Sequence, residues 1–142
     1  MAKISITHQT GDQFQIGIRG HELTVDQPRH GAETGPSPTE LFVASLAACV
    51  GHYAVRFLRA NQVPCDGLQI GCEWTMLAAR PPRVGRIRIE VSAPVPVPPE
   101  LHDGLRDAMD GCLVHNSLRQ PPEVVIGLRS RAGPVPADRV GR

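Results

Sequence analysis

The chain has 142 residues, a formal net charge of +1 and four cysteines, with 41% hydrophobic and 20% charged residues. This length and mixture predict one globular domain rather than a disordered chain, and the near-zero charge excludes the strongly basic surface on which nucleic-acid binding usually depends. The N-terminus lacks a hydrophobic signal region and the apolar stretch 41–50 is too short to span a bilayer, so we expect a cytoplasmic protein with no membrane partner and with reduced cysteines.

Three short strands are predicted at the N-terminus. Residues 3–8 and 13–18 alternate between polar and apolar side chains around the turn sequence "TGDQ", which is typical of a hairpin. A third strand is predicted over 21–28, and a loop rich in Gly and Pro follows over 29–38.

A long helix begins next, with Ser37 as N-cap, Pro38 at the first helical position and Glu40 completing a capping box. It is predicted to run to about Asn61. Apolar residues surround its first three turns, so we expect it to be buried on all sides.

The remaining elements follow in order. Alternating patterns predict paired strands over 68–78 and 85–93, and a 3.6-residue period predicts a helix over 97–112. A short turn or helix is expected at "CLVHNSL", a last strand over 123–130 and a flexible tail over 132–142, which leaves 1–131 as the domain. Too few helices alternate with strands for a parallel sheet, so the fold class predicted is α+β with antiparallel sheets.

Cys49 lies in the middle of the long helix, and two interpretations are open for it. A buried free cysteine is usually an inert small hydrophobe, whereas a reactive one needs a cation close to its sulfur. His52, Arg56 and the distant Arg19 are the candidate cations, and spacing does not choose among them.

A third interpretation is a zinc site. Cys112 precedes His115 with the spacing that also separates Cys49 from His52, and two C-x-x-H pairs supply the four ligands of a tetrahedral zinc ion. The spacing is common by chance, so our prediction for metal is none. Cys65 and Cys72 are interpreted as packing residues.

Two segments resemble the signatures of the OsmC and organic hydroperoxide resistance family. They are "GPSPTELFVASLAAC" (35–49) and "CLVHNSL" with the following "PPEVVIGL" (112–128). The resemblance implies an OsmC-like fold in which two chains intertwine as a homodimer around buried central helices. The family has Glu directly after the signature proline, where this chain has Thr39, and often Ser or Tyr where this chain has His115.

The resemblance also implies a two-cysteine peroxidase acting in oxidative stress defence. Cys49 would be the peroxidatic thiolate and Cys112 the resolving thiol, with Arg19 and Glu40 polarising the reactive sulfur. The apolar surroundings favour organic hydroperoxides, and the expected substrate-binding residues are Phe42, Leu46, His52 and Tyr53. No cofactor is expected beyond an external dithiol reductant, for which a lipoyl-type compound is the candidate. The alternative is a small-ligand binding protein whose cysteines do not cycle.

Overall fold

The structure is a computed structural model that describes residues 3–130 and 133–134. Its elements in chain order are β1 (Ile4–His8), β2 (Phe14–Ile18), β3 (His21–Val25), α1 (Pro38–Ala60), β4 (Gln69–Leu77), β5 (Arg83–Ser92), the 3₁₀ turn η1 (Pro99–Leu101), α2 (His102–Asp110), α3 (Leu113–Arg119), β6 (Arg129–Ser130) and β7 (Gly133–Pro134). All strand pairs are antiparallel, and they form a β1–β2–β3 sheet, a β4–β5 ribbon and a β6–β7 pair. The predicted α+β class is confirmed.

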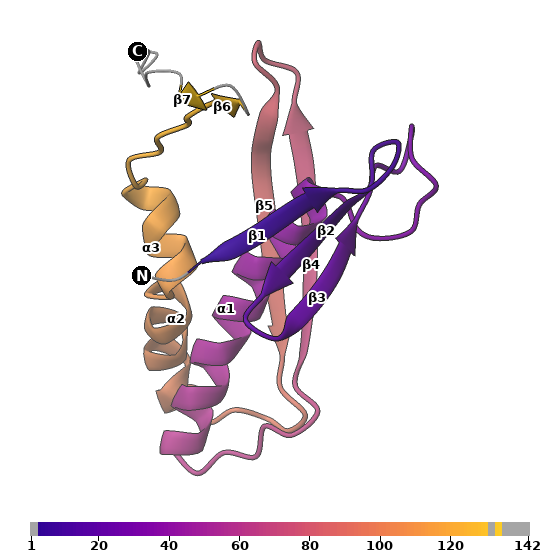
Figure 1. The fold of residues 1–142 in the computed structure, drawn as a ribbon. Helices are drawn as coiled ribbons and strands as arrows, with labels where there is room; N and C mark the ends of the chain where they lie inside the picture. Colours follow the sequence, from indigo (N-terminus) through magenta and orange to yellow (C-terminus); the bar gives the residue numbers. More distant parts are fainter. Residues whose placement is uncertain (1–2, 131–132, 135–142) are drawn as a thin grey trace.

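Helix α1 is the central element, between the β4–β5 ribbon on one side and α2 and α3 on the other (Figure 1). Its start is the predicted one: the Ser37 hydroxyl accepts from the Glu40 backbone N–H, and the Glu40 carboxylate accepts from the Ser37 N–H at 2.7 Å. The helix lies so close to the ribbon that a Cβ on Gly51 would be 2.1 Å from Cδ1 of Ile70. A larger residue at this position would have to displace the end of the Ile70 side chain.

The β4–β5 ribbon has one apolar face, which explains where it packs. Cross-strand partners share a face, and three successive partner pairs are apolar: Ile70 with Val91, Cys72 with Ile89, and Trp74 with Ile87. The intervening positions are polar or Gly. The apolar face therefore lies against α1, and the polar face is left to solvent.

Burial of α1 is one-sided in this chain. Val43, Leu46, Ala47, Val50, Ala54 and Leu58 are buried, as is Gly51. Ala44, Ser45, Ala48 and His52 are exposed. The expectation that α1 is covered on every side is therefore wrong for the single chain, because α2, α3 and the ribbon cover only part of its circumference.

By length and composition alone, α1 could cross a membrane, with a mean hydropathy of 1.6 over 18 residues. The core helix of a globular domain passes the same test. Because α1 packs against β4, α2 and α3 of its own chain, we describe it as a core helix.

The C-terminal region departs from the sequence prediction. Of the strand expected over 123–130, only Arg129 and Ser130 pair with another strand, and residues 121–128 are irregular. Val124, Val125, Ile126 and Leu128 are between 66% and 88% exposed, since no strand lies alongside them in the described part of the chain. Of the predicted tail, 132–142, only Gly133 and Pro134 are described, as β7; the other residues lie outside the described ranges.

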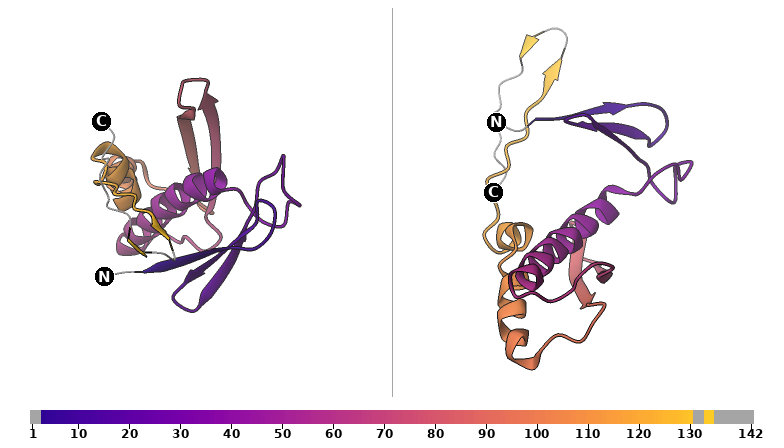
Figure 2. Two further views of the ribbon diagram at one scale, coloured as in Figure 1. Left: turned by 45° about the horizontal axis from the view of Figure 1, so that its top comes forward. Right: turned by 90° about the horizontal axis from the view of Figure 1, so that it is seen from below.

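The β1–β2–β3 sheet extends away from the rest of the chain (Figure 2). A buried carboxylate orders the loop that joins it to α1. Asp26 is 1% exposed and accepts from the N–H of Gln27 at 2.8 Å and from the N–H and hydroxyl of Thr34 at 3.2 and 3.0 Å. These hydrogen bonds lower the pKa of Asp26, and the one from the Gln27 N–H has the largest effect.

We predict that Asp26→Asn makes the protein less stable at neutral pH and less sensitive to acid. A depressed folded-state pKa contributes stability above the unfolded value near pH ~4, and this contribution is lost as pH falls through the folded value. Urea unfolding midpoints measured between about pH 3 and pH 7 should therefore fall more steeply for wild type than for the variant. Parallel curves for the two proteins would contradict the assignment.

Candidate functional site

The structure brings Cys49 and Cys112 together. Cys112 is fully buried in a cluster with Leu46 and Val50, and half-buried Cys49 packs against this cluster. Both are free thiols in one cluster, and their side chains interact, because the packing of α1 against α2 and α3 places the start of α3 beside the middle of α1. The juxtaposition could not be derived from spacing in the sequence.

The two sulfur atoms are electrostatically linked. Burial is the main cause that raises the pKa of Cys112, and the hydrogen bond from the His115 backbone N–H, the next largest cause, opposes it; the interaction with Cys49 raises the pKa by a smaller amount. A negative charge on one sulfur therefore disfavours a negative charge on the other. At most one thiolate is favoured at a time.

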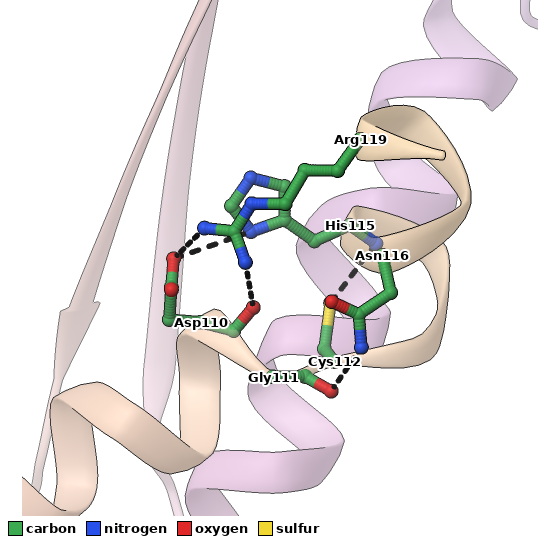
Figure 3. Close-up of polar contacts among 6 residues, drawn as sticks. All are labelled: Asp110, Gly111, Cys112, His115, Asn116 and Arg119. Carbon is green, nitrogen blue, oxygen red and sulfur yellow. Dashed lines mark hydrogen bonds and ion pairs between the residues drawn. The ribbon is translucent and has the colours of Figure 1, made fainter. Parts of the chain in front are cut away.

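Cys112 is positioned by the backbone of α3. Cys112 is the N-cap residue of α3, and its Sγ accepts a hydrogen bond from the backbone N–H of His115 at 3.4 Å (Figure 3). The Asn116 amide donates to the Gly111 carbonyl at 3.0 Å, which holds the connection between α2 and α3. The sulfur is therefore fixed from both sides along the chain.

A charged cluster lies next to this connection. The Asp110 carboxylate accepts from the Arg119 guanidinium at 2.6 Å, and the same oxygen is 3.5 Å from Nδ1 of His115 (Figure 3). Arg119 also donates to the Asp110 carbonyl at 3.3 Å. The Arg119 hydrogen bond is the main cause that lowers the pKa of Asp110, so this carboxylate stays ionised.

A cavity of about 510 Å³ adjoins the cysteine cluster. Its lining combines an apolar floor with a polar rim: Leu46, Val50, Ile87, Ile89, Val91 and Met109 form the floor, and Arg106, Asp107, Asp110 and His115 form the rim. Leu46 and Val50 belong to both the cavity wall and the Cys112 cluster. Neither cysteine lines the cavity itself, and these two side chains separate an apolar ligand in it from the cysteine pair.

The two residues expected to polarise the thiol lie elsewhere in the single chain. Glu40 is the capping-box residue, its pKa lowered by hydrogen bonds from Ser37. It lies nine positions before Cys49, about 14 Å along the helix axis. Arg19 is exposed in the β2–β3 turn, and no ion pair involves it within the described residues.

The expected substrate-binding residues divide into two groups. Leu46 lines the cavity and Tyr53 packs against the Cys112 cluster, with the Arg56 guanidinium 5.8 Å from its ring centroid. Phe42 and His52 are exposed and do not line this cavity. Sequence reasoning missed the β5 side chains, Met109 and Asp110, because tertiary packing alone brings them to the cysteines; His115 was noticed only as a zinc candidate.

The zinc interpretation is not supported by the geometry. No group of three or more His, Cys, Asp or Glu side chains able to hold a metal ion occurs among residues 3–130. The remaining cysteines fit the packing interpretation: Cys65 is buried with Leu58 and Val63, and burial raises the pKa of Cys72.

Solved structures similar to this chain share its fold. A protein of Psychrobacter arcticus 273-4 described as an osmotic stress induced and detoxification response protein has a TM-score of 0.77 at 21% identity, with 82% of this chain and 88% of that chain covered. An OsmC-like protein from Mycoplasma pneumoniae has a TM-score of 0.69 at 18% identity, with 85% and 89% covered. The organic hydroperoxide resistance protein OhrB of Bacillus subtilis has a TM-score of 0.63 at 19% identity, with 85% and 92% covered.

No curated protein sequence matches the chain. The model of the family described as OsmC-like protein matches residues 30–127, which include both cysteines and the cavity lining. Members of this family are linked to osmotic stress and hydroperoxide resistance. The chain therefore belongs to the OsmC-like protein family.

Proposed function

We propose that this protein is a thiol-dependent peroxidase that reduces organic hydroperoxides with Cys49 and Cys112. The observation that carries the proposal is the contact of these two free thiols, far apart in the sequence, inside one apolar cluster. The adjoining cavity supports an organic substrate, since burial of an alkyl chain contributes about 0.8 kcal/mol per CH₂.

The reaction has three balanced steps. The Cys49 thiolate attacks the distal peroxide oxygen; an S–O bond forms, the O–O bond breaks, and the alkoxide takes a proton to leave as alcohol. The Cys112 thiol then condenses with the Cys49 sulfenic acid to form a disulfide and water. An external dithiol, for which we propose a lipoyl-type compound, reduces the disulfide by exchange and becomes a disulfide itself.

The electrostatics of the pair support this order of events. Burial is the main cause of the raised pKa of Cys112 and a charge on Cys49 adds to it, so ionisation of Cys49 favours the thiol form of Cys112. Oxidation of Cys49 to the uncharged sulfenic acid removes that charge. Cys112 then ionises more readily, at the moment when its thiolate is needed.

The experiment is a peroxide consumption assay with purified protein. Wild type should reduce cumene hydroperoxide over many turnovers with dihydrolipoamide as the reductant. It should reduce hydrogen peroxide more slowly, because hydrogen peroxide has no apolar group to bury in the cavity. No consumption with any dithiol offered would reject the peroxidase. Ligand that copurifies, together with slow alkylation of Cys49, would then favour the alternative of a binding protein.

A homodimer in the cytoplasm is part of the proposal. In β1 and β2, Ile4 pairs with Ile18 and Ile6 with Ile16, so these side chains share one face of the sheet. Ile4 and Ile6 are each 60% exposed, and the exposed segment 124–128 is a second uncovered apolar surface. A second copy of the chain that covers these surfaces would remove an aggregation hazard.

We predict that light scattering gives a mass of twice 15.3 kDa at micromolar concentration. Ile6→Glu should shift the mass towards the monomer or cause aggregation, because it places a charge in the apolar face. Thr7→Glu is the matched control, since Thr7 is exposed on the opposite, polar face of the same strand. A wild-type mass of 15.3 kDa at these concentrations would contradict the dimer.

A further inference from the structure

We propose that His115 transfers the proton that the Cys49 reaction requires, and that Asp110 is its positioning residue. The inference rests on the proposed peroxidase function and names a residue that the family resemblance did not supply. It addresses the ionisation of Cys49, for which neither Glu40 nor Arg19 is placed within the single chain.

The position of His115 supports this role. Its backbone N–H donates to Cys112 Sγ at 3.4 Å, and the side chain of Cys112 interacts with that of Cys49. Its side chain lines the cavity with Leu46 and Val50, which flank Cys49 on α1 at three positions before and one after. The cavity therefore runs along His115 and the turn of α1 that carries Cys49, while Cys49 itself does not line it.

The hydrogen bonding of His115 supports a base. Asp110 is held as a carboxylate by Arg119 and can only accept hydrogen bonds. The ring nitrogen that faces it, Nδ1 at 3.5 Å, is therefore favoured to carry the proton of the neutral ring. Nε2 then retains its lone pair, and no hydrogen bond to Nε2 occurs within the described residues.

The rival candidate on α1 is less well placed. His52 follows Cys49 by three positions, but its side chain is exposed and does not line the cavity. Arg56 is engaged over the Tyr53 ring. Only His115 combines a place in the cavity wall with a carboxylate that orients its ring, among the histidines of residues 3–130.

The proton transfers balance. His115 takes the proton of the Cys49 thiol, the thiolate attacks the distal oxygen of ROOH, and the O–O bond breaks as the S–O bond forms. The protonated ring then gives its proton to the departing alkoxide. Cys49–SH and ROOH thus become Cys49–SOH and ROH, sulfur is oxidised by two electrons and His115 returns to its starting state.

One protonation state of the Cys49–His115 pair is active, so the rate should fall on both sides of a pH optimum. The ionisable groups that line the cavity with His115 or pair with it are Arg106, Asp107 and Asp110 of α2 and Arg119 of α3. Cys112, Cys49 and Tyr53 belong to the adjoining cluster, and β5 contributes only apolar side chains to the cavity. His115→Gln removes the histidine from the Cys49–His115 pair. The rate of the variant should then depend on pH only through the fraction of Cys49 that is thiolate.

The test measures consumption of the first equivalent of cumene hydroperoxide by rapid mixing. At neutral pH, His115→Gln should lower the second-order rate constant by roughly 100-fold, the lower end of general acid–base contributions. It should also change the two-sided pH profile to a one-sided profile. Asp110→Asn should lower the rate by less, and His30→Gln, an exposed histidine of the loop before α1, is the matched control that keeps the wild-type rate.

Several outcomes would overturn the inference. The first is a rate constant of His115→Gln within threefold of the wild-type value. The second is a rate constant that falls by the same factor at every pH. Either result would mean that His115 has only a structural role. Loss of rate in His52→Gln instead would assign the proton transfer to α1.

Alkylation of Cys49 by iodoacetamide, quantified by peptide mass spectrometry, tests the pair without a peroxide. His115→Gln should lower this rate about tenfold at neutral pH, and an unchanged rate rejects the inference even if wild type reduces no hydroperoxide. Wild-type protein that is unreactive towards peroxide but shows the alkylation effect would reject the peroxidase and keep the His115–Cys49 coupling.

Discussion

We expect Cys49→Ser to reduce peroxide turnover to the rate of the dithiol alone, a loss of at least about a thousandfold. A serine hydroxyl stays protonated at neutral pH and cannot attack the peroxide oxygen, whereas a thiol ionises near neutrality. Turnover is measured as peroxide consumption with excess dithiol. Sulfenic acid, detected with a selective trap, should be absent at position 49.

The fold should survive this substitution. Ser and Cys have nearly equal helix propensities, and Cys49 is only half-buried. Cys65→Ser and Cys72→Ser are matched controls, because both cysteines lie outside the sulfur pair, in the second core cluster and in β4. Both should keep turnover. Activity of Cys49→Ser close to wild type would reject Cys49 as the peroxidatic residue.

Cys112→Ser is expected to stop the cycle after its first step. Each chain should consume about one equivalent of peroxide and then accumulate the Cys49 sulfenic acid, because the thiol that forms the disulfide is missing. Steady-state consumption should fall by at least about tenfold, the remainder reflecting direct attack of the dithiol on the sulfenic acid. The burst amplitude and the mass of the Cys49 peptide after oxidation measure the two effects separately.

The serine variant keeps the local structure of the α3 start. Serine is a favoured N-cap residue, and its hydroxyl can accept from the His115 N–H in place of the sulfur. A disulfide formed in the Cys112→Ser variant between Cys49 and another cysteine, with normal turnover, would contradict the role of Cys112. So would a wild-type protein in which peroxide oxidises Cys49 without linking it to Cys112.

The sequence predicted the local structure well wherever neighbouring residues determine it. The Ser37–Glu40 capping box, the length of α1 and the alternation of β4 and β5 depend on side chains a few positions apart, and the structure has all three. The strand predicted over 123–130 is mostly irregular, because its alternation needs a partner strand that the described chain does not supply.

The candidate site could be predicted only in part. Cys49 and Cys112 were identified from segments resembling the family signatures, and the family model confirms the family. The roles of Arg19 and Glu40 stay predictions that the single chain does not support, since Glu40 caps its helix and Arg19 lies in an exposed turn. His115 was noticed for its spacing from Cys112, yet nothing in that spacing indicates an ion pair with Asp110.

The sequence by itself determined the elements, the α+β class and the two cysteines on which chemistry could depend, because capping, periodicity and turn preferences act over a few residues. The tertiary structure alone decided that α1 packs against α2 and α3 so that the two cysteines share one cluster, that side chains of β5 line a cavity next to it, and that Asp110 lies 3.5 Å from the His115 ring. These contacts join residues distant in the chain, and their geometry follows from the packing of whole helices and strands rather than from any local pattern.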